Sequence, residues 1–363
     1  MRYGSESAVL GDRNISQSVD LNLINKYRKE LFGIASVMIV FHHLTVRGSG
    51  NPLADIYMFL RLLGAMGVDL FLFLSGIGLV YSYEKNKSLK EFYVRRCKRI
   101  LPAYLFIVFP FYLWKDCIVG KNGLLVLAEH LFLVQFWKEG AGDWFIAAIF
   151  ILYALFPLIY YTVKNIRGGG YWLTLVYVLL MLALSFKIMP DTFGPTSTLW
   201  ARIPVFMTGV MAAVKMKDKS ILSKSILPIC VILNILSLVL QAYFALQGSE
   251  MYYSYLPRLC YGPLAITFII IAVSFFEKQR FKKLQRIFVF LGEMTLEIYL
   301  LNSKLIGFFS GLAAKTTEIS NDRLIVLANI LGVAVTIILA FYIHKIIEKM
   351  RLQYEKEQGT GLS

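Results

Sequence analysis

The sequence predicts an all-α protein that crosses a membrane many times. Hydrophobic residues make up 57% of the 363 residues, whereas soluble domains contain roughly 45–50%. These residues are gathered in blocks of about 20, the length at which a helix spans the core of a bilayer. The charged residues lie mostly between the blocks. Because backbone polar groups in lipid must be satisfied within each segment, we expect every block to be a helix.

Ten membrane-spanning helices are predicted. They cover residues 31–48, 63–83, 101–120, 143–163, 171–188, 199–214, 226–246, 256–276, 287–311 and 324–347. The apolar segment 124–137 is shorter and contains Glu129 and His130, so we expect it to be re-entrant or interfacial. The resulting organisation is an N-terminal tail over residues 1–30, one transmembrane domain over 31–347, and a C-terminal tail over 348–363.

The positive charges predict the orientation. A net charge of +15 would suggest a nucleic-acid partner in a soluble protein. Here 27 of the 38 lysines and arginines fall in the tails and the even-numbered loops or at the span ends that adjoin them, and only 8 fall in the odd-numbered loops or at their adjoining span ends. Cytoplasmic loops carry this excess, so both tails are predicted to be cytoplasmic, and no nucleic acid is expected to bind. The four cysteines lack the spacing of a zinc site, and no metal is expected.

Two adjacent histidines, His42 and His43, lie in the outward half of the first predicted span. Neighbouring residues of a helix are about 100° apart, so only one of the two is expected to face the bundle. An imidazole can act as a general base near neutral pH. A histidine at the membrane edge can also simply contact water or lipid head groups, and the pair alone leaves both interpretations open.

The second predicted span begins with Asp69 and contains Ser75 and Gly76. Small residues of this kind allow a neighbouring helix to approach closely, and Ser75 also offers a hydroxyl. A carboxylate at the start of an apolar helix is either a cap or part of a polar site. The sequence alone does not separate these two roles for Asp69.

Three arginines are clustered in the predicted loop 90–102, at positions 95, 96 and 99. Arg95 and Arg99 are four residues apart and would share one face of a helix. Guanidinium groups bind phosphates through paired hydrogen bonds, so the cluster suits a phosphate-bearing ligand. The positive-inside signal itself and anionic lipid are the competing explanations.

Charged and aromatic residues also occur at the start of the fourth predicted span and within the ninth. Asp143 and Trp144 open the fourth span, where Trp144 also suits the interfacial aromatic belt. Glu293 and Glu297 are four residues apart in the ninth span, and Lys304 follows them. Charged groups inside a span are costly unless they are paired or hydrated, so they predict a polar interior. Arg202 and Arg258 either line the same interior or extend to the interface.

Five blocks of the chain together resemble the membrane acyltransferase-3 family, over residues 27–344. In sequence order they are GIASVMIVFHH, GVDLFLFLSGIGLVYS, FYVRRCKRILPAYL, DWFIAAIFILYALFPLI and LGEMTLEIYLLN. The resemblance implies an enzyme of the bacterial cytoplasmic membrane that moves an acetyl group from acetyl-CoA to a hydroxyl of a cell-envelope saccharide or glycolipid. Membrane lipids would be its other partners.

The resemblance also implies roles for individual residues. His43 falls on the catalytic position and would act as the base or as a transient carrier of the acyl group. His42 is its neighbour, and Asp69 or Glu297 would orient the imidazole. The donor site would comprise Arg95, Arg96, Arg99 and Ser75, and the acceptor site Asp143, Trp144, Asn302 and Arg258. The chain departs from the family pattern at Phe32, where many members have an arginine, and at Asn302, where many have a histidine.

Two other classes of protein remain as alternatives. A secondary transporter also has about ten spans and a polar interior, but it is expected to contain broken helices near the midplane. A non-catalytic membrane sensor or partner domain is favoured if the departures at Phe32 and Asn302 reflect a degenerate site.

Overall fold

The computed structural model describes most of the chain. The described residues are 18–19, 22–45, 61, 63–140, 142–188, 190–193, 195–217, 222–223, 227–246, 255–278, 281–315 and 322–360. Most of the predicted N-terminal tail, the last three residues of the predicted first span and the last three residues of the chain lie outside these ranges.

The predicted all-α membrane fold is confirmed. Among the described residues, the strands are two short segments, β1 (Ser18–Val19) and β2 (Leu222–Ser223), which pair antiparallel. Seven described helical stretches are long and apolar enough to cross a bilayer. They are Met66–Lys85, Leu89–Val119, Trp144–Asn165, Gly169–Ile188, Ser197–Lys217, Tyr255–Glu277 and Arg323–Gln353. The count of ten spans and the cytoplasmic position of both termini stay predictions.

The chain divides into two compact units that alternate along the sequence. The His43 unit comprises Lys29–Phe71, Asn86–Tyr153 and Lys282–Ser363, and the Glu84 unit comprises Met1–Arg28, Leu72–Lys85 and Ala154–Phe281. Three boundaries fall inside single helices, α3 (Arg28–His43), α5 (Met66–Lys85) and α9 (Trp144–Asn165).

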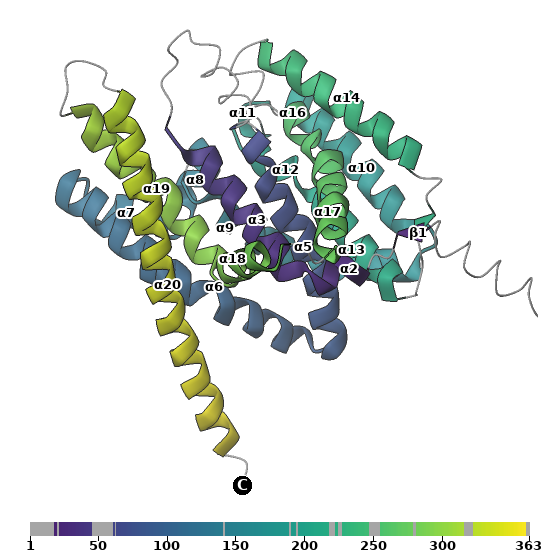
Figure 1. Cartoon of the computed structure of the whole chain (residues 1–363), viewed down its shortest axis with the longest axis horizontal. Helices are drawn as coiled ribbons and strands as arrows, with labels where there is room; N and C mark the ends of the chain where they lie inside the picture. Colours follow the sequence, from purple (N-terminus) through teal and green to yellow (C-terminus); the bar gives the residue numbers. More distant parts are fainter. Residues whose placement is uncertain are drawn as a thin grey trace, which may run out of the picture. The chain divides into compact units, whose positions relative to one another are not determined.

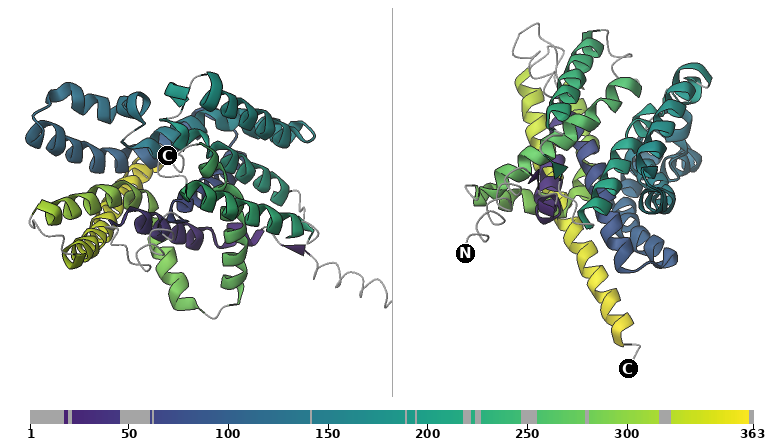
Figure 2. Two further views of the ribbon diagram at one scale, coloured as in Figure 1. Left: turned by 90° about the horizontal axis from the view of Figure 1, so that it is seen from above. Right: turned by 90° about the vertical axis from the view of Figure 1, so that its right-hand side faces the viewer.

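The His43 unit is made of helices from three separate parts of the chain (Figure 1). Besides the first parts of α5 and α9, its elements are α3 (Arg28–His43), α6 (Leu89–Tyr112), the π-helix η1 (Leu113–Val119), α7 (Gly123–Leu131), α8 (Val134–Glu139), α18 (Lys282–Glu293), α19 (Thr295–Lys315) and α20 (Asp322–Thr360). Both α7 and α8 are too short to span a bilayer, as expected for segment 124–137. Figures 1 and 2 show α7 folded back beside η1 and α19 running along α20.

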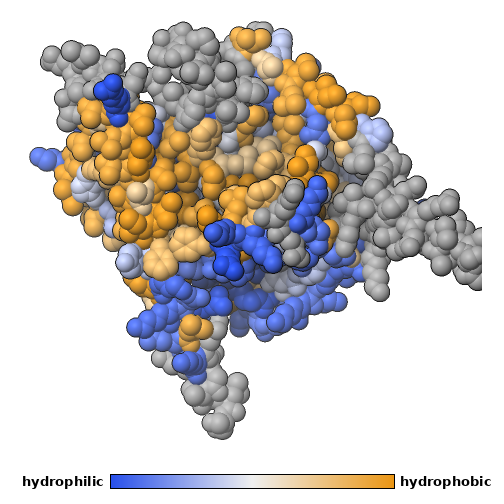
Figure 3. All heavy atoms as spheres, in the orientation of Figure 1, coloured by the Kyte–Doolittle hydropathy of each residue, from blue (hydrophilic) through white to orange (hydrophobic). Residues whose placement is uncertain are grey.

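The apolar surface of this unit follows α19 and α20. In the orientation of Figure 1, hydrophobic side chains cover α19 and the first part of α20, and hydrophilic side chains gather around the later part of α20 (Figure 3). Exposed apolar residues on α20 include Val326, Ile330 and Ile338. A helix with such a surface is suited to contact with lipid.

The ninth predicted span is divided, which corrects one expectation. The helix breaks at Met294, so Glu293 ends α18 and Glu297 lies in the first turn of α19. The two carboxylates therefore do not share a face of one continuous helix. Glu293 is exposed and forms an ion pair with Lys29 at 2.8 Å, whereas Glu297 is buried. In α18, charged and apolar side chains lie on opposite faces and no side chain is buried, a pattern that suits a helix at the membrane interface.

Two glycines allow α3 and α18 to touch backbone to backbone. A Cβ atom on Gly33 would lie 2.0 Å from the carbonyl oxygen of Phe288, and a Cβ atom on Gly292 would lie 2.0 Å from that of Lys29. Only glycine fits such contacts, since real Cβ atoms do not approach a neighbouring atom so closely. This crossing fixes the first half of α3, and His43 lies at the other end of the same helix.

The Glu84 unit contains the fifth to eighth predicted spans. Its helices are α2 (Asn22–Lys26), α10 (Gly169–Ala183), η2 (Leu184–Ile188), α11 (Pro190–Phe193), α12 (Ser197–Trp200), α13 (Ile203–Lys217), α14 (Leu227–Leu246), α16 (Tyr255–Leu259) and α17 (Tyr261–Glu277). Glu84 accepts hydrogen bonds from Tyr160 at 2.6 Å and Lys164 at 2.9 Å, and also binds Lys217. These contacts join the ends of α5, α9 and α13.

The crossing of α3 and α18 leads to a first prediction. Gly33→Ala should lower the free energy of unfolding by about 1–3 kcal/mol, because the added methyl group overlaps the Phe288 carbonyl and α18 must move. Thermal unfolding in detergent measures this. Gly311→Ala is the matched control, since no atom of the described residues lies within 4 Å of its Cβ position. It should be neutral or stabilising by up to about 1 kcal/mol. Equal effects of the two substitutions would contradict the prediction.

Candidate functional site

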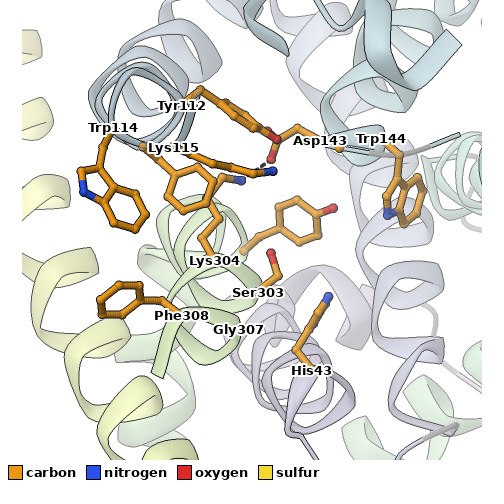
Figure 4. Close-up of a pocket in the computed structure, with 13 residues that line it drawn as sticks. His43, Tyr112, Trp114, Lys115, Asp143, Trp144, Ser303, Lys304, Gly307 and Phe308 are labelled. Carbon is orange, nitrogen blue, oxygen red and sulfur yellow. Dashed lines mark hydrogen bonds and ion pairs between the residues drawn. The ribbon is translucent and has the colours of Figure 1, made fainter. Parts of the chain in front are cut away.

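His43 is the last residue of α3, and one of its ring nitrogens is committed to the backbone. Its Nδ1 atom lies 2.8 Å from the carbonyl oxygen of Ile39, one turn earlier. A carbonyl oxygen can only accept a hydrogen bond, so Nδ1 must carry the hydrogen. In the neutral ring, Nε2 is then left with a lone pair, and Figure 4 shows this end of the ring pointing into a pocket. This is the tautomer that a general base requires.

His42 points elsewhere and is held by a different segment. Its Nδ1 atom lies 2.9 Å from the carbonyl oxygen of Arg61, and the Arg61 Nε atom donates to the carbonyl oxygen of His42 at 2.9 Å. The two imidazole rings meet edge to face, with centroids 5.3 Å apart. His42 does not line the pocket that His43 faces. The two neighbours are thus separated by the helix geometry, as expected.

The pocket has a volume of about 470 Å³ and lies within the His43 unit (Figure 4). Its aromatic wall consists of Phe111, Tyr112, Trp114, Trp144, Tyr299 and Phe308. Its polar side chains are His43, Lys115, Asp143, Ser303 and Lys304. A largely apolar cavity with a few convergent polar groups is the usual form of a small-molecule site.

A buried ion pair forms one wall of this pocket. The Lys304 ammonium contacts the Asp143 carboxylate, and the two side chains are only 8% and 5% exposed. The ammonium also lies over the rings of Phe111, at 5.5 Å from the centroid, and Tyr112, at 5.7 Å. Burial of charge is tolerated when the groups are paired, and the aromatic faces add further attraction for the cation. The pocket therefore presents a fixed pair of charges near a histidine with a free nitrogen.

Comparison with known proteins adds the family. Residues 33–345 match the family profile described as an acyltransferase domain, which covers most of the chain. The chain belongs to the acyltransferase-3 family. The resemblance drawn from the five sequence blocks is thereby confirmed. No curated protein and no solved structure matched the chain. Together with the apolar helices, the family makes this protein a multi-pass membrane acyltransferase.

The pocket of this acyltransferase contains three of the residues to which the sequence analysis assigned a role in catalysis or binding. They are His43, Asp143 and Trp144. His43 lies at the end of α3, whereas Asp143 and Trp144 lie at the start of α9. Residues 100 positions apart in sequence therefore line one cavity. Their roles in catalysis or binding stay predictions.

The two carboxylates expected to orient His43 lie in other surroundings. Glu297 is buried, and its Oε1 atom lies 3.0 Å from Nδ1 of His344 on α20. Asp69 is fully buried in the first turn of α5, where the helix dipole favours a negative charge. Neither carboxylate lines the pocket. The atom at Nδ1 of His43 is instead the Ile39 carbonyl oxygen, and the roles of the two carboxylates stay predictions.

The arginine cluster lies on α6, which corrects the expectation of a loop. Helix α6 begins after Ser88, whose hydroxyl accepts a hydrogen bond from the Glu91 backbone, and it continues into the third predicted span. Arg95 forms an ion pair with Glu91 at 3.3 Å, and Arg99 is exposed. Arg96 turns away from them, over the rings of Phe92 at 5.6 Å and Tyr153 at 6.0 Å.

The remaining predicted site residues do not line the pocket. Ser75 is half-buried on the part of α5 that belongs to the Glu84 unit. Arg258, in the same unit, donates to the Ser197 hydroxyl at 2.6 Å. Asn302 is fully buried and donates to the carbonyl oxygens of Ile298 and Tyr299 on its own helix.

Several pocket residues were not assigned a role from the sequence. The charge of Lys304 inside a predicted span was the available signal, and it pointed to a polar interior. Tyr112, Trp114 and Phe308 gave no signal, because aromatic residues near the ends of spans are common at membrane interfaces.

The buried ion pair generates a prediction about stability. Lys304→Met leaves the Asp143 carboxylate buried without its partner, so it should lower the free energy of unfolding by about 3–5 kcal/mol. The double variant Lys304→Met/Asp143→Leu should be more stable than Lys304→Met alone. Denaturant unfolding in detergent measures both.

The exposed pair of Lys345 with Glu348 on α20 supplies the control. Lys345→Met should change stability by no more than about 1 kcal/mol, since exposed pairs contribute little. If Lys304→Met were as stable as Lys345→Met, the prediction that loss of the buried pair is strongly destabilising would be wrong.

Proposed function

We propose that this membrane acyltransferase transfers an acetyl group from acetyl-CoA to a hydroxyl of a cell-envelope saccharide or glycolipid, in the cytoplasmic membrane of a bacterium. The observation that carries the proposal is the tautomer of His43, whose unprotonated Nε2 atom faces an aromatic and charged pocket. A free imidazole nitrogen in a cavity is what the deprotonation of a hydroxyl requires.

In the proposed reaction, His43 accepts the proton of the acceptor hydroxyl as the oxygen forms a bond to the thioester carbonyl carbon. The Nδ1–H bond to Ile39 holds the ring and stabilises the protonated imidazole. The carbon–sulfur bond then breaks, and His43 returns its proton to the leaving thiolate. The Lys304 ammonium supplies a positive charge in the same pocket, where it favours the negative charge that develops on the carbonyl oxygen.

The aromatic lining supports a saccharide as the acceptor. Trp114, Trp144 and Tyr299 present ring faces or edges to the pocket, and such rings pack against the apolar face of a sugar ring. Asp143 and Ser303 offer hydrogen-bonding oxygens beside them. One saccharide hydroxyl would then lie near Nε2 of His43.

Helix α6 supports a donor that reaches from the arginines to the pocket. Arg99 lies in its first half and Tyr112, which lines the pocket, at its end. At 1.5 Å per residue these positions are about 20 Å apart along the axis. A donor held by its phosphates at Arg95 and Arg99 would need a long, thin arm to bring its acyl group to His43. The pantetheine arm of CoA has this form.

Turnover of acetyl-CoA labelled in the acetyl group tests the role of His43. In lipid nanodiscs the wild-type protein should transfer the label to saccharide or release it to water. His43→Ala should lower this rate about 10²–10⁴-fold, the usual contribution of a general base.

His42→Ala is the matched comparison and should retain most of the turnover, because His42 lies outside the pocket. Equal turnover in wild type and His43→Ala would refute the assignment of the base. No turnover in wild type, with any saccharide or with water, would favour a non-catalytic domain.

The arginines of α6 generate a separate prediction. Arg95→Gln and Arg99→Gln should each raise KM for acetyl-CoA about 10-fold or more, because each removes a charge-assisted hydrogen bond to phosphate. The value of kcat should change little, since the interaction is the same in the ground and transition states. Lys345→Gln, an exposed cation on α20, is the control. An unchanged KM in both arginine variants would argue against a donor site at α6.

A further inference from the structure

A second histidine–carboxylate pair lies beside the pocket, and the proposed reaction does not use it. Nδ1 of His130 on α7 lies 2.9 Å from Oδ2 of Asp116 and 3.1 Å from the carbonyl oxygen of Val126. The side chains of His130 and Asp116 are only 12% and 3% exposed. The Val126 carbonyl can only accept, so Nδ1 carries a hydrogen and donates it there, while the Asp116 carboxylate lies beside the same nitrogen without a hydrogen bond of its own from Oδ2. A buried carboxylate is costly, and it marks a feature that the fold maintains.

The pair depends on a local irregularity of the backbone. Asp116 lies in η1, where α6 continues as a π-helix beyond Tyr112. The extra residue per turn in a π-helix shifts the direction of the side chains, and such segments are frequent at functional sites. Here the shift accompanies Asp116 facing α7, while Tyr112, four residues earlier, lies on the pocket wall.

Tyr112 connects this pair to the pocket. Its ring stacks on the His130 ring, with centroids 4.1 Å apart and an interplanar angle of 14°. Its hydroxyl points toward Asp143 (Figure 4), and a Cβ atom on Gly142 would lie 3.7 Å from that hydroxyl. Asp143 in turn pairs with Lys304, whose ammonium lies over the Tyr112 ring. A continuous series of side-chain contacts therefore connects Asp116 to Lys304.

We propose that His130 and Asp116 are positioning residues for the pocket: the Val126 carbonyl and the adjacent Asp116 carboxylate hold the His130 ring, the ring fixes Tyr112, and Tyr112 holds the Asp143–Lys304 pair against the cavity. Neither His130 nor Asp116 lines the cavity, so neither touches the substrate. The catalytic consequence rests on the proposed acyl transfer. The structural consequence is that the Lys304 ammonium is held in one place, and it does not depend on that reaction.

The test measures Lys304 directly. Protein in nanodiscs is treated with an amine-modifying reagent, and the rate of modification at Lys304 is followed by mass spectrometry. His130→Ala should raise this rate about fivefold or more, the size expected for residues coupled in one network. In a Tyr112→Leu background, His130→Ala should have no further effect, because the connecting ring is already absent. His130→Leu, which fills similar space without an aromatic ring, carries the test if His130→Ala does not fold.

Tyr104→Phe is the matched control. The Tyr104 hydroxyl donates to the backbone carbonyls of His130 and Leu131, at 3.3 and 3.1 Å, so its loss weakens the attachment of α7 without altering the stacked rings. This variant should leave Lys304 modification unchanged. Equal acceleration by His130→Ala in both backgrounds, or by Tyr104→Phe, would overturn the proposal, as would no acceleration at all.

Turnover separates this proposal from the proposed function. With active wild-type protein, His130→Ala should lower kcat for acetyl-CoA about 10-fold while changing its KM little, because the donor phosphates bind elsewhere. A rise in KM with kcat unchanged would contradict a positioning role. If the wild-type protein has no turnover, the proposed function fails, and the modification rates alone still decide whether His130 positions Lys304.

Discussion

The ion pair between Asp143 and Lys304 fixes how the walls of the pocket fit together. Both side chains are almost fully buried, so separating them would leave charges in a medium of low dielectric constant. The start of α9 and the middle of α19 must therefore keep their register. The rings of Phe111 and Tyr112 at the end of α6 lie under the ammonium and complete the contact. Three segments far apart in sequence meet at this pair, and His43 faces the cavity that they enclose.

The sequence predicted those parts of the site whose residues are unusual within an apolar segment. A histidine, a carboxylate and a lysine within apolar segments are costly, and His43, Asp143 and Lys304 all lie at the pocket. Residues that are common in or near apolar segments, such as Tyr112 and Trp114, gave no such signal. The partner of Glu297 was also beyond reach, because His344 belongs to another helix, 47 residues later, and no local pattern links them.

The fold was predictable at the level of class and less so at the level of helix boundaries. Hydropathy identifies apolar segments but not interruptions, so the break at Met294 between α18 and α19 was missed. The same averaging cut α6 too short, since its polar first half carries the arginines and resembles a loop. The glycines that place α3 against α18 act through contacts between segments, which composition does not reveal.

The hydrogen bond from His43 to the Ile39 carbonyl keeps the orientation of the imidazole within a single turn of α3. A base held by a side chain from another helix would lose its alignment whenever that helix moved or mutated. Here the His43 ring and the carbonyl that holds it belong to the same turn of one helix and move together. The aromatic side chains across the cavity come from other helices, so they can change without disturbing the orientation of the His43 ring.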